Sequence, residues 1–220
     1  MRRRAVLLDL DGTLIDSRPG IVESHHAAIR ALGHAPDPGH DLTFAIGPPL
    51  DDVMGLVLSR YGDDRVAEGV LAYRAHYERR GYLGSVLYPG VREAVAALRA
   101  AGHVLHVATS KRRVPAVMIL EHLGLAPLLD GIYGSEPGGA LDHKPELIAH
   151  LLSREGIAAA DAVMVGDRRY DVSGAHANGV RAVGALWGYG GREELEAAGA
   201  DALAASASDL PREVLRVAPG

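Results

Sequence analysis

From Val91 to the end of the chain, short apolar segments alternate with segments of helical periodicity. Val91–Ala101 has apolar residues on one helical face, for example, and the apolar segment His103–Ala108 follows it. This alternation predicts a parallel β-sheet covered by helices on both faces. An earlier apolar segment, Arg4–Leu10, is too short and too apolar for a surface helix, and we predict it as a further buried strand. The chain is therefore expected to have an α/β fold with a doubly wound parallel-sheet core.

The same periodicity places the other elements of this core. Further strands are predicted at Gly131–Gly134, Ala162–Val165, Arg181–Ala185 and near Ala202. Further helices are predicted at Val114–Leu123, Pro145–Arg154, Val172–Asn178 and Arg192–Ala198, several with a Pro at the start or a Gly after the end.

Residues 17–87 lack this alternation. Pro19–Leu32 has the pattern of a helix, residues 34–50 form a proline-containing connector, and residues 51–80 indicate helices broken near Tyr61. Tyr88–Gly90 then marks the return to the alternating pattern. We therefore expect a helical segment inserted between the first strand and the rest of the sheet.

Composition excludes several classes of protein. The net charge of −5 gives no basic surface for nucleic acid. No apolar run reaches the roughly 18–20 residues that a membrane-spanning helix needs. The chain has no cysteine, which excludes disulfides and cysteine nucleophiles, and it shows no export signal. We expect a cytoplasmic protein that binds neither nucleic acid nor membranes.

Polar side chains follow the predicted core strands, at the positions where parallel strands end. They are Asp9, Asp11, Thr109, Ser110, Lys111, Lys144, Asp167 and Asp171. Ligands of doubly wound sheets bind outside the carboxyl ends of the strands, so these side chains should meet there. Four crowded carboxylates would repel one another, and a hard divalent cation such as Mg²⁺ relieves that repulsion. Such a cation with lysine and hydroxyl donors would suit a phosphoryl group.

Four segments together carry a resemblance to a known family. Asp9–Ser17 resembles the first motif of the haloacid dehalogenase-like hydrolase superfamily, and Val107–Lys111 resembles its second motif. Lys144–Pro145 resembles the third motif and Gly166–Asp171 the fourth. The motifs span nearly the whole chain, and the set as a whole is specific.

The resemblance implies roles for individual residues. Asp9 would attack the phosphorus atom, and Asp11 would protonate the leaving oxygen and then deprotonate the attacking water. Thr109 and Lys144 would complete the catalytic set. The implied phosphate-binding residues are Gly12, Thr109, Ser110 and Lys144. The implied cofactor is Mg²⁺, with ligands from Asp9, Asp11 (its backbone carbonyl), Asp167 and Asp171.

The resemblance also implies the domain organisation. Residues 1–16 and 88–220 would form the catalytic core, and residues 17–87 a small helical cap that closes over the site. Candidate residues for substrate specificity are Gly47, Pro48, Arg74 and Lys111. Position 168 departs from the pattern, since it is Arg where many relatives carry Ser or Thr, and we expect a modest local change there. Trp187 and Tyr189 are expected to pack the domain rather than to contact ligands.

Further segments, among them Ile46–Leu50 and Trp187–Gly190, resemble the branch that includes phosphoglycolate phosphatase-like and 5′-nucleotidase-like members. This resemblance implies a magnesium-dependent phosphatase for a small phosphorylated metabolite, with a nucleoside monophosphate as one substrate class. Phosphoglycolate phosphatase, a sugar-phosphate mutase and, from another class, a phospho-accepting signalling module are the alternatives. The enzyme would act as a monomer or a homodimer.

Overall fold

The computed structural model describes residues 4–139 and 141–217. The chain divides into two compact units, one made of the residues up to Asp16 and from Leu87 onward, the other of Ser17–Val86. Both boundaries fall at a two-stranded sheet of β2 (Ile15–Asp16) and β3 (Val86–Leu87). The second boundary lies one residue earlier than the sequence predicts, since Leu87 groups with the first unit.

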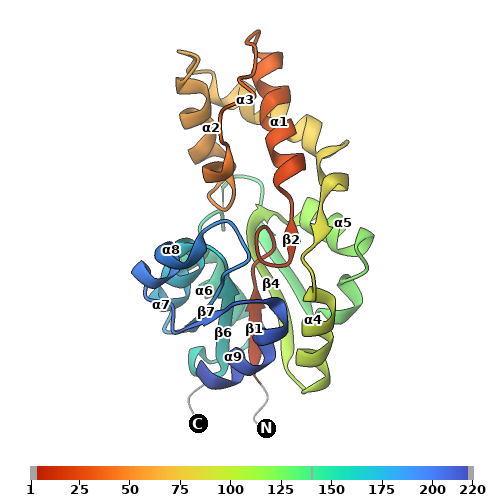
Figure 1. The fold of residues 1–220 in the computed structure, drawn as a ribbon, viewed down its shortest axis with the longest axis vertical. Coiled ribbons are helices and arrows are strands. Elements are labelled where there is room, and N and C mark those ends of the chain that lie inside the picture. The colour runs from red at the N-terminus through yellow and green to blue at the C-terminus, as the bar shows by residue number, and fades with distance from the viewer. Residues whose placement is uncertain (1–3, 140, 218–220) are drawn as a thin grey trace. The chain divides into compact units, whose positions relative to one another are not determined.

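The first unit is built on a six-stranded sheet with the order β5-β4-β1-β6-β7-β8 (Figure 1). The strands are β1 (Ala5–Leu8), β4 (Val104–Arg112), β5 (Gly131–Ser135), β6 (Ala162–Gly166), β7 (Arg181–Ala185) and β8 (Ala202–Ala204). All pairings in this sheet are parallel. The predicted α/β fold is therefore confirmed.

Strand β1 lies in the middle of the sheet, between β4 and β6; the chain forms β4 and β5 on one side of β1 and then crosses to β6 on the other side. Its register pairs Leu8 with Val107 of β4 and with Val165 of β6. The residues that follow β1, β4 and β6 therefore emerge side by side at one edge. This edge is the switch point where doubly wound sheets bind ligands.

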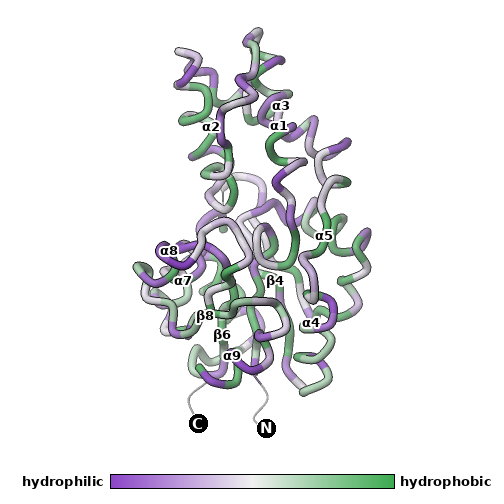
Figure 2. The backbone as a smooth tube through the Cα atoms, viewed as in Figure 1, coloured by the Kyte–Doolittle hydropathy of each residue, from purple (hydrophilic) through white to green (hydrophobic). Residues whose placement is uncertain are grey.

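Helices cover both faces of the sheet (Figure 1). One face carries α6 (Lys144–Glu155), α7 (Arg169–Ala177) and α8 (Gly191–Ala197), and the other carries α4 (Val91–Ala100), α5 (Arg113–His122) and α9 (Leu210–Val217). A core cluster joins Leu7 and Met164 of the sheet to Leu147 and Leu151 of α6, all fully buried. Figure 2 shows the matching run of hydrophobic residues along β4 and β6. Burial on both faces explains why β6 and the first half of β4 are mostly apolar in the sequence.

Two predicted boundaries in this unit differ from the structure by three residues or more, and one helix was not predicted. Strand β4 continues to Arg112 instead of ending at Ala108, because a register shift after Thr109 lets Arg112 pair with Ser135 of β5. Helix α7 begins at Arg169, three residues before the predicted start, and its first turn is stabilised by a 3.1 Å hydrogen bond from the Arg168 backbone N–H to Asp171 Oδ2. Helix α9, which begins at Leu210 with a Pro in its first turn, was not predicted.

The second unit is helical and has its own small core. It contains α1 (Arg18–Ala31), α2 (Leu50–Ser59) and α3 (Val66–Tyr77), and α3 packs against both other helices. Ile29, Leu42 and Val57 form a fully buried cluster in this unit. Among the described residues of both units, no helix combines the length and the apolar character needed to cross a membrane.

Candidate active site

The centre of the site is a buried lysine held between two aspartates. Lys144 Nζ lies 2.6 Å from Asp9 Oδ1 and 2.6 Å from Asp171 Oδ1, and it donates a 2.7 Å hydrogen bond to the Ala108 carbonyl. Lys144 begins α6, Asp9 follows β1, and Asp171 lies in the first turn of α7. Residues far apart in the chain thus meet at the switch point of the sheet.

A third carboxylate, that of Asp167, completes this group. Oxygens of Asp9, Asp167 and Asp171 lie within 4.8 Å of one another, and we call these three residues the carboxylate cluster. All three are at most 4% exposed. Asp167 Oδ2 accepts a 2.7 Å hydrogen bond from the Tyr189 backbone N–H, and Oδ1 accepts a 3.2 Å bond from the Thr13 hydroxyl.

Burial and mutual repulsion change the acidity of the cluster. Burial raises the pKa of Asp9 to about 7, against the opposing effect of Lys144. Burial and the charges of Asp9 and Asp171 raise the pKa of Asp167 well above its ordinary value. Although burial opposes it, the charges of Asp171 and Asp9 raise the pKa of Lys144. Lys144 therefore remains protonated at neutral pH.

The cluster has the chemistry of a magnesium site. One ammonium group faces three buried carboxylates, so the three carboxylates in their ionised form carry more negative charge than Lys144 neutralises. Mg²⁺ prefers carboxylate oxygens and neutralises such an excess. The donor set of Asp9, Asp167 and Asp171 therefore fits this cation.

Asp11 faces a different partner. Its Oδ2 lies 2.8 Å from Lys111 Nζ, and the two side chains are 9% and 10% exposed. Asp11 Oδ1 is buried and accepts no hydrogen bond from the described residues. The Asp11 side chain is not part of the carboxylate cluster, and the predicted metal contact of this residue was through its backbone carbonyl.

The predicted phosphate-binding residues lie around the same sheet edge. Thr109 and Ser110 belong to β4 itself, because that strand is longer than predicted. Thr109 is buried, and its hydroxyl accepts a 3.2 Å hydrogen bond from the Lys111 backbone N–H. Gly12 has a φ of +89°, and a Cβ there would lie 2.3 Å from Asp167 Oδ2, so no other residue fits this turn.

The loop Trp187–Gly190 belongs to the site, although the sequence analysis assigned Trp187 and Tyr189 to packing alone. Tyr189 donates its backbone N–H to Asp167, and Trp187 Nε1 donates a 2.9 Å bond to the Thr13 carbonyl. A Cβ at Gly188 would lie 2.3 Å from Asp167 Cβ, and one at Gly190 would lie 2.2 Å from the Asp167 carbonyl oxygen. The signal for this role was the pair of glycines around Tyr189 directly after a strand.

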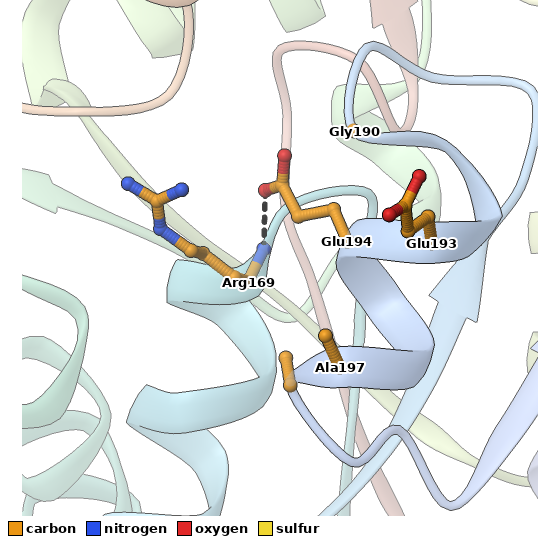
Figure 3. A pocket seen from close by; sticks show the side chains of 6 residues that line it. Arg169, Gly190, Glu193, Glu194 and Ala197 are labelled. Carbon is orange, nitrogen blue, oxygen red and sulfur yellow. Dashed lines mark hydrogen bonds between the residues drawn. The ribbon is translucent and has the colours of Figure 1, made fainter.

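The unusual Arg168 is held by helix α8. Its Nε donates a 2.9 Å hydrogen bond to Glu194 Oε1, which also accepts a 2.8 Å bond from the Arg169 backbone N–H (Figure 3). The Arg168 side chain is 9% exposed, so a large cation is accommodated by burial and pairing. Glu194 thereby connects α8 to the residue that follows Asp167.

A pocket of about 490 Å³ opens beside this contact (Figure 3). Its lining residues are Arg169, Gly190, Glu193, Glu194, Ala197 and Ala198. No member of the carboxylate cluster lines it, and it meets the candidate site only through Gly190 of the Trp187–Gly190 loop.

The predicted specificity residues Gly47, Pro48 and Arg74 lie in the helical unit. Gly47 has a φ of +110°, which favours glycine, and Pro48 follows it just before α2. The Arg74 guanidinium forms a 3.0 Å ion pair with Asp51 of the same unit. Their roles toward a substrate stay predictions.

Comparison with known proteins agrees with this geometry. Residues 6–185 match the family described as haloacid dehalogenase-like hydrolase. A 5′-nucleotidase of Pseudomonas aeruginosa is 42% identical over 90% of this chain and 89% of its own length. A phosphoglycolate phosphatase encoded on a plasmid of Cupriavidus necator is 36% identical over 94% of this chain and 91% of its own length.

Two further similarities extend the comparison. The tyrosine-protein kinase PtkA of Mycobacterium tuberculosis is 41% identical over 84% of this chain, which spans 62% of the kinase's length. The crystal structure of a predicted phosphatase from Clostridium acetobutylicum superposes with a TM-score of 0.91 at 33% identity, and covers 98% of this chain and 100% of that one.

The fold, with its candidate site at the switch point of a parallel sheet, and these similarities together define a hydrolase. The chain belongs to the haloacid dehalogenase-like hydrolase family, in its phosphoglycolate phosphatase and 5′-nucleotidase-like branch, and is a phosphatase of that branch.

Proposed function

We propose that the protein is a cytoplasmic, magnesium-dependent phosphatase that hydrolyses a small phosphate monoester through a phospho-aspartate on Asp9. The observation that carries this proposal is the buried contact of 2.6 Å between Asp9 and Lys144, within a cluster of three carboxylates. At one point, Asp9 would supply the nucleophile, Lys144 the fixed positive charge and the carboxylate cluster the ligands for a metal ion.

In the first step, an Asp9 carboxylate oxygen attacks the phosphorus atom. A bond forms between Asp9 and phosphorus, the bond from phosphorus to the ester oxygen breaks, and Asp11 gives its proton to that oxygen. In the second step, water attacks phosphorus and gives a proton to Asp11, and the Asp9–phosphorus bond breaks. Inorganic phosphate leaves, and both aspartates return to their initial states.

The surrounding residues bind the phosphoryl group. Lys144 places a positive charge 2.6 Å from the nucleophilic carboxylate, where it offsets negative charge on the transferring group. Thr109 and Ser110 supply hydroxyl groups at the end of β4, and Gly12 lets the backbone come close to the ligand. Asp9, Asp167 and Asp171, with the Asp11 carbonyl, would hold Mg²⁺, which neutralises charge on the phosphoryl oxygens when bound.

A nucleoside monophosphate is one proposed substrate class, on the similarity to the Pseudomonas aeruginosa 5′-nucleotidase. Phosphoglycolate is the other, on the similarity to the Cupriavidus necator phosphatase. Both are small monoesters, and both need the same catalytic groups.

The proposal is tested by phosphate release from p-nitrophenyl phosphate and a panel of small monoesters, with Mg²⁺ and with EDTA. We expect turnover that needs Mg²⁺ and is lost in Asp9→Asn, because the amide is a poor nucleophile. Asp142→Asn is a matched control, since it makes the same chemical change in the loop before α6, outside the cluster. Turnover of Asp9→Asn equal to that of the wild type would contradict the phospho-aspartate mechanism.

A further inference from the structure

Lys111 holds one oxygen of Asp11 and leaves the other for a ligand. Its Nζ lies 2.8 Å from Asp11 Oδ2, while Asp11 Oδ1 is buried without a hydrogen-bond partner among the described residues. Under the proposed function, Oδ1 is then the oxygen that meets the ester oxygen of the substrate. The Lys111 ammonium therefore lies on the leaving-group side of the reacting phosphorus.

The two contacts limit how far Lys111 is from the leaving group. A hydrogen bond of ordinary length from Asp11 Oδ1 to the ester oxygen, the width of the carboxylate and the 2.8 Å contact of Oδ2 with Lys111 together place Nζ within about 8 Å of that oxygen. A carboxylate that binds Nζ at ordinary length and lies between Nζ and the ester oxygen would then be within about 5 Å of the ester oxygen. A carboxylate attached to the carbon that bears the ester oxygen meets this requirement.

We propose that Lys111 selects phosphate esters whose leaving group carries a carboxylate on the ester-bearing carbon, as in 2-phosphoglycolate. This inference rests on the proposed function and names its substrate class. An ammonium has three N–H donors in a compact charge, so it has the capacity to bond Asp11 and a substrate carboxylate together. A nucleoside leaving group has no anion at that position and gains nothing from Lys111.

A nearby cation provides a matched control for this charge. Arg113 lies two residues further along the chain and is exposed, and its Nε donates a 3.2 Å hydrogen bond to the Ile132 carbonyl. Arg113→Met changes the net charge of the protein by the same amount as Lys111→Met, but it leaves the contact between Asp11 and Lys111 unchanged.

The experiment compares kcat/KM for 2-phosphoglycolate with that for its neutral amide analogue, phosphoglycolamide. Both esters need Asp11 equally, so a general effect of a substitution on Asp11, or on the folded fraction, cancels in their ratio. The proteins are the wild type, Lys111→Met, Lys111→Arg and Arg113→Met, all with saturating Mg²⁺.

We expect the wild type to prefer phosphoglycolate and Lys111→Met to lose about 10- to 100-fold of that preference, the usual effect of one charge-assisted hydrogen bond. Lys111→Arg should keep a ratio closer to that of the wild type, and Arg113→Met should leave it unchanged. Any of three results, obtained with an active enzyme, would overturn the inference. The wild type would show no preference for phosphoglycolate, Lys111→Met would keep the wild-type preference, or Lys111→Arg would lose as much of it as Lys111→Met. No turnover of any ester by the wild type would instead refute the proposed function on which it rests.

Discussion

Replacing Asp167 by Asn should stabilise the metal-free protein. The same substitution should abolish the stabilisation of the folded protein by Mg²⁺. Asp167 is fully buried, and its oxygens lie within 4.8 Å of those of Asp9 and Asp171. Lys144 pairs with both of these neighbours, so the three groups around Asp167 carry a net charge of about −1. The amide of Asn keeps the shape of the side chain and removes this repulsion.

Coulomb's law gives the size of the effect. Two unit charges 4.8 Å apart repel by about 3.5 kcal/mol at an effective dielectric constant of ~20. The hydrogen bonds survive, because Asn Oδ1 accepts from the Tyr189 N–H and Asn Nδ2 donates to the Thr13 hydroxyl. We therefore expect the free energy of unfolding of Asp167→Asn, in EDTA at pH 8, to exceed that of the wild type by about 3 kcal/mol. For a chain of this size, each kcal/mol raises Tm by roughly 2–4 °C.

The pH dependence follows from the sign of the shift. A raised pKa means that folded Asp167 holds its proton more strongly than the unfolded chain does. The stability that this protonation provides is therefore complete below the ordinary pKa of 3.8 and is lost as pH rises toward the folded pKa. The difference in Tm between variant and wild type should shrink from pH 8 to pH 5.

Thermal unfolding of both proteins, with EDTA or Mg²⁺ and at both pH values, is the measurement. Mg²⁺ at about 100 times its Kd should stabilise the wild type by about 2.7 kcal/mol, and should not stabilise Asp167→Asn. Asp142→Asn controls for the change in net charge and should behave as the wild type. An Asp167→Asn variant that unfolds at a lower Tm than the wild type in EDTA at pH 8, or that gains as much from Mg²⁺, would refute the reasoning.

Three other substitutions test the same site. Lys144→Met should destabilise the folded protein by about 3–5 kcal/mol in EDTA, measured by urea unfolding, because it leaves buried carboxylates without their cation. Gly188→Ala should weaken Mg²⁺ binding at least about tenfold, measured by calorimetry, because the new Cβ displaces Asp167. A tenfold loss of affinity corresponds to only about 1.4 kcal/mol of binding free energy, which is small beside such a clash. Tyr189→Phe should cost about 1 kcal/mol of stability through the lost 2.9 Å bond to Asp16, and should keep Mg²⁺ affinity within about twofold, because the backbone N–H to Asp167 remains.

The positions of the strands along the chain and the polar residues after them could be predicted because both depend on local sequence patterns. Strands buried on two faces must be continuous apolar runs, and Asp9, Lys144 and Asp167 interrupt or follow these runs at the sheet edge. The end of β4 could not be predicted in this way. It continues past Thr109 only because Arg112 finds a backbone partner in β5, and no local pattern contains that pairing.

Asp171, predicted from the sequence as a Mg²⁺ ligand, also caps a helix. Its Oδ2 accepts a hydrogen bond from the Arg168 backbone N–H at the start of α7, while its Oδ1 pairs with Lys144. The two roles are linked, because the cap fixes the carboxylate in the orientation from which it meets the lysine. An aspartate that caps a helix with one oxygen can therefore also belong to a functional site, if its second oxygen contacts a buried charge.

The Trp187–Gly190 loop was missed for a reason that also explains its importance. Its contacts reach Thr13 and Asp167, and these distances depend on the pairing of β7 with β6 and of β6 with β1. Without the fold, Tyr189 was only an aromatic residue after a strand. With it, the backbone N–H of Tyr189 becomes the donor that orients the most buried carboxylate of the cluster, and the flanking glycines are required because any Cβ would occupy the space of Asp167. The geometry of the proposed metal site therefore depends on a loop that has no acidic residue of its own.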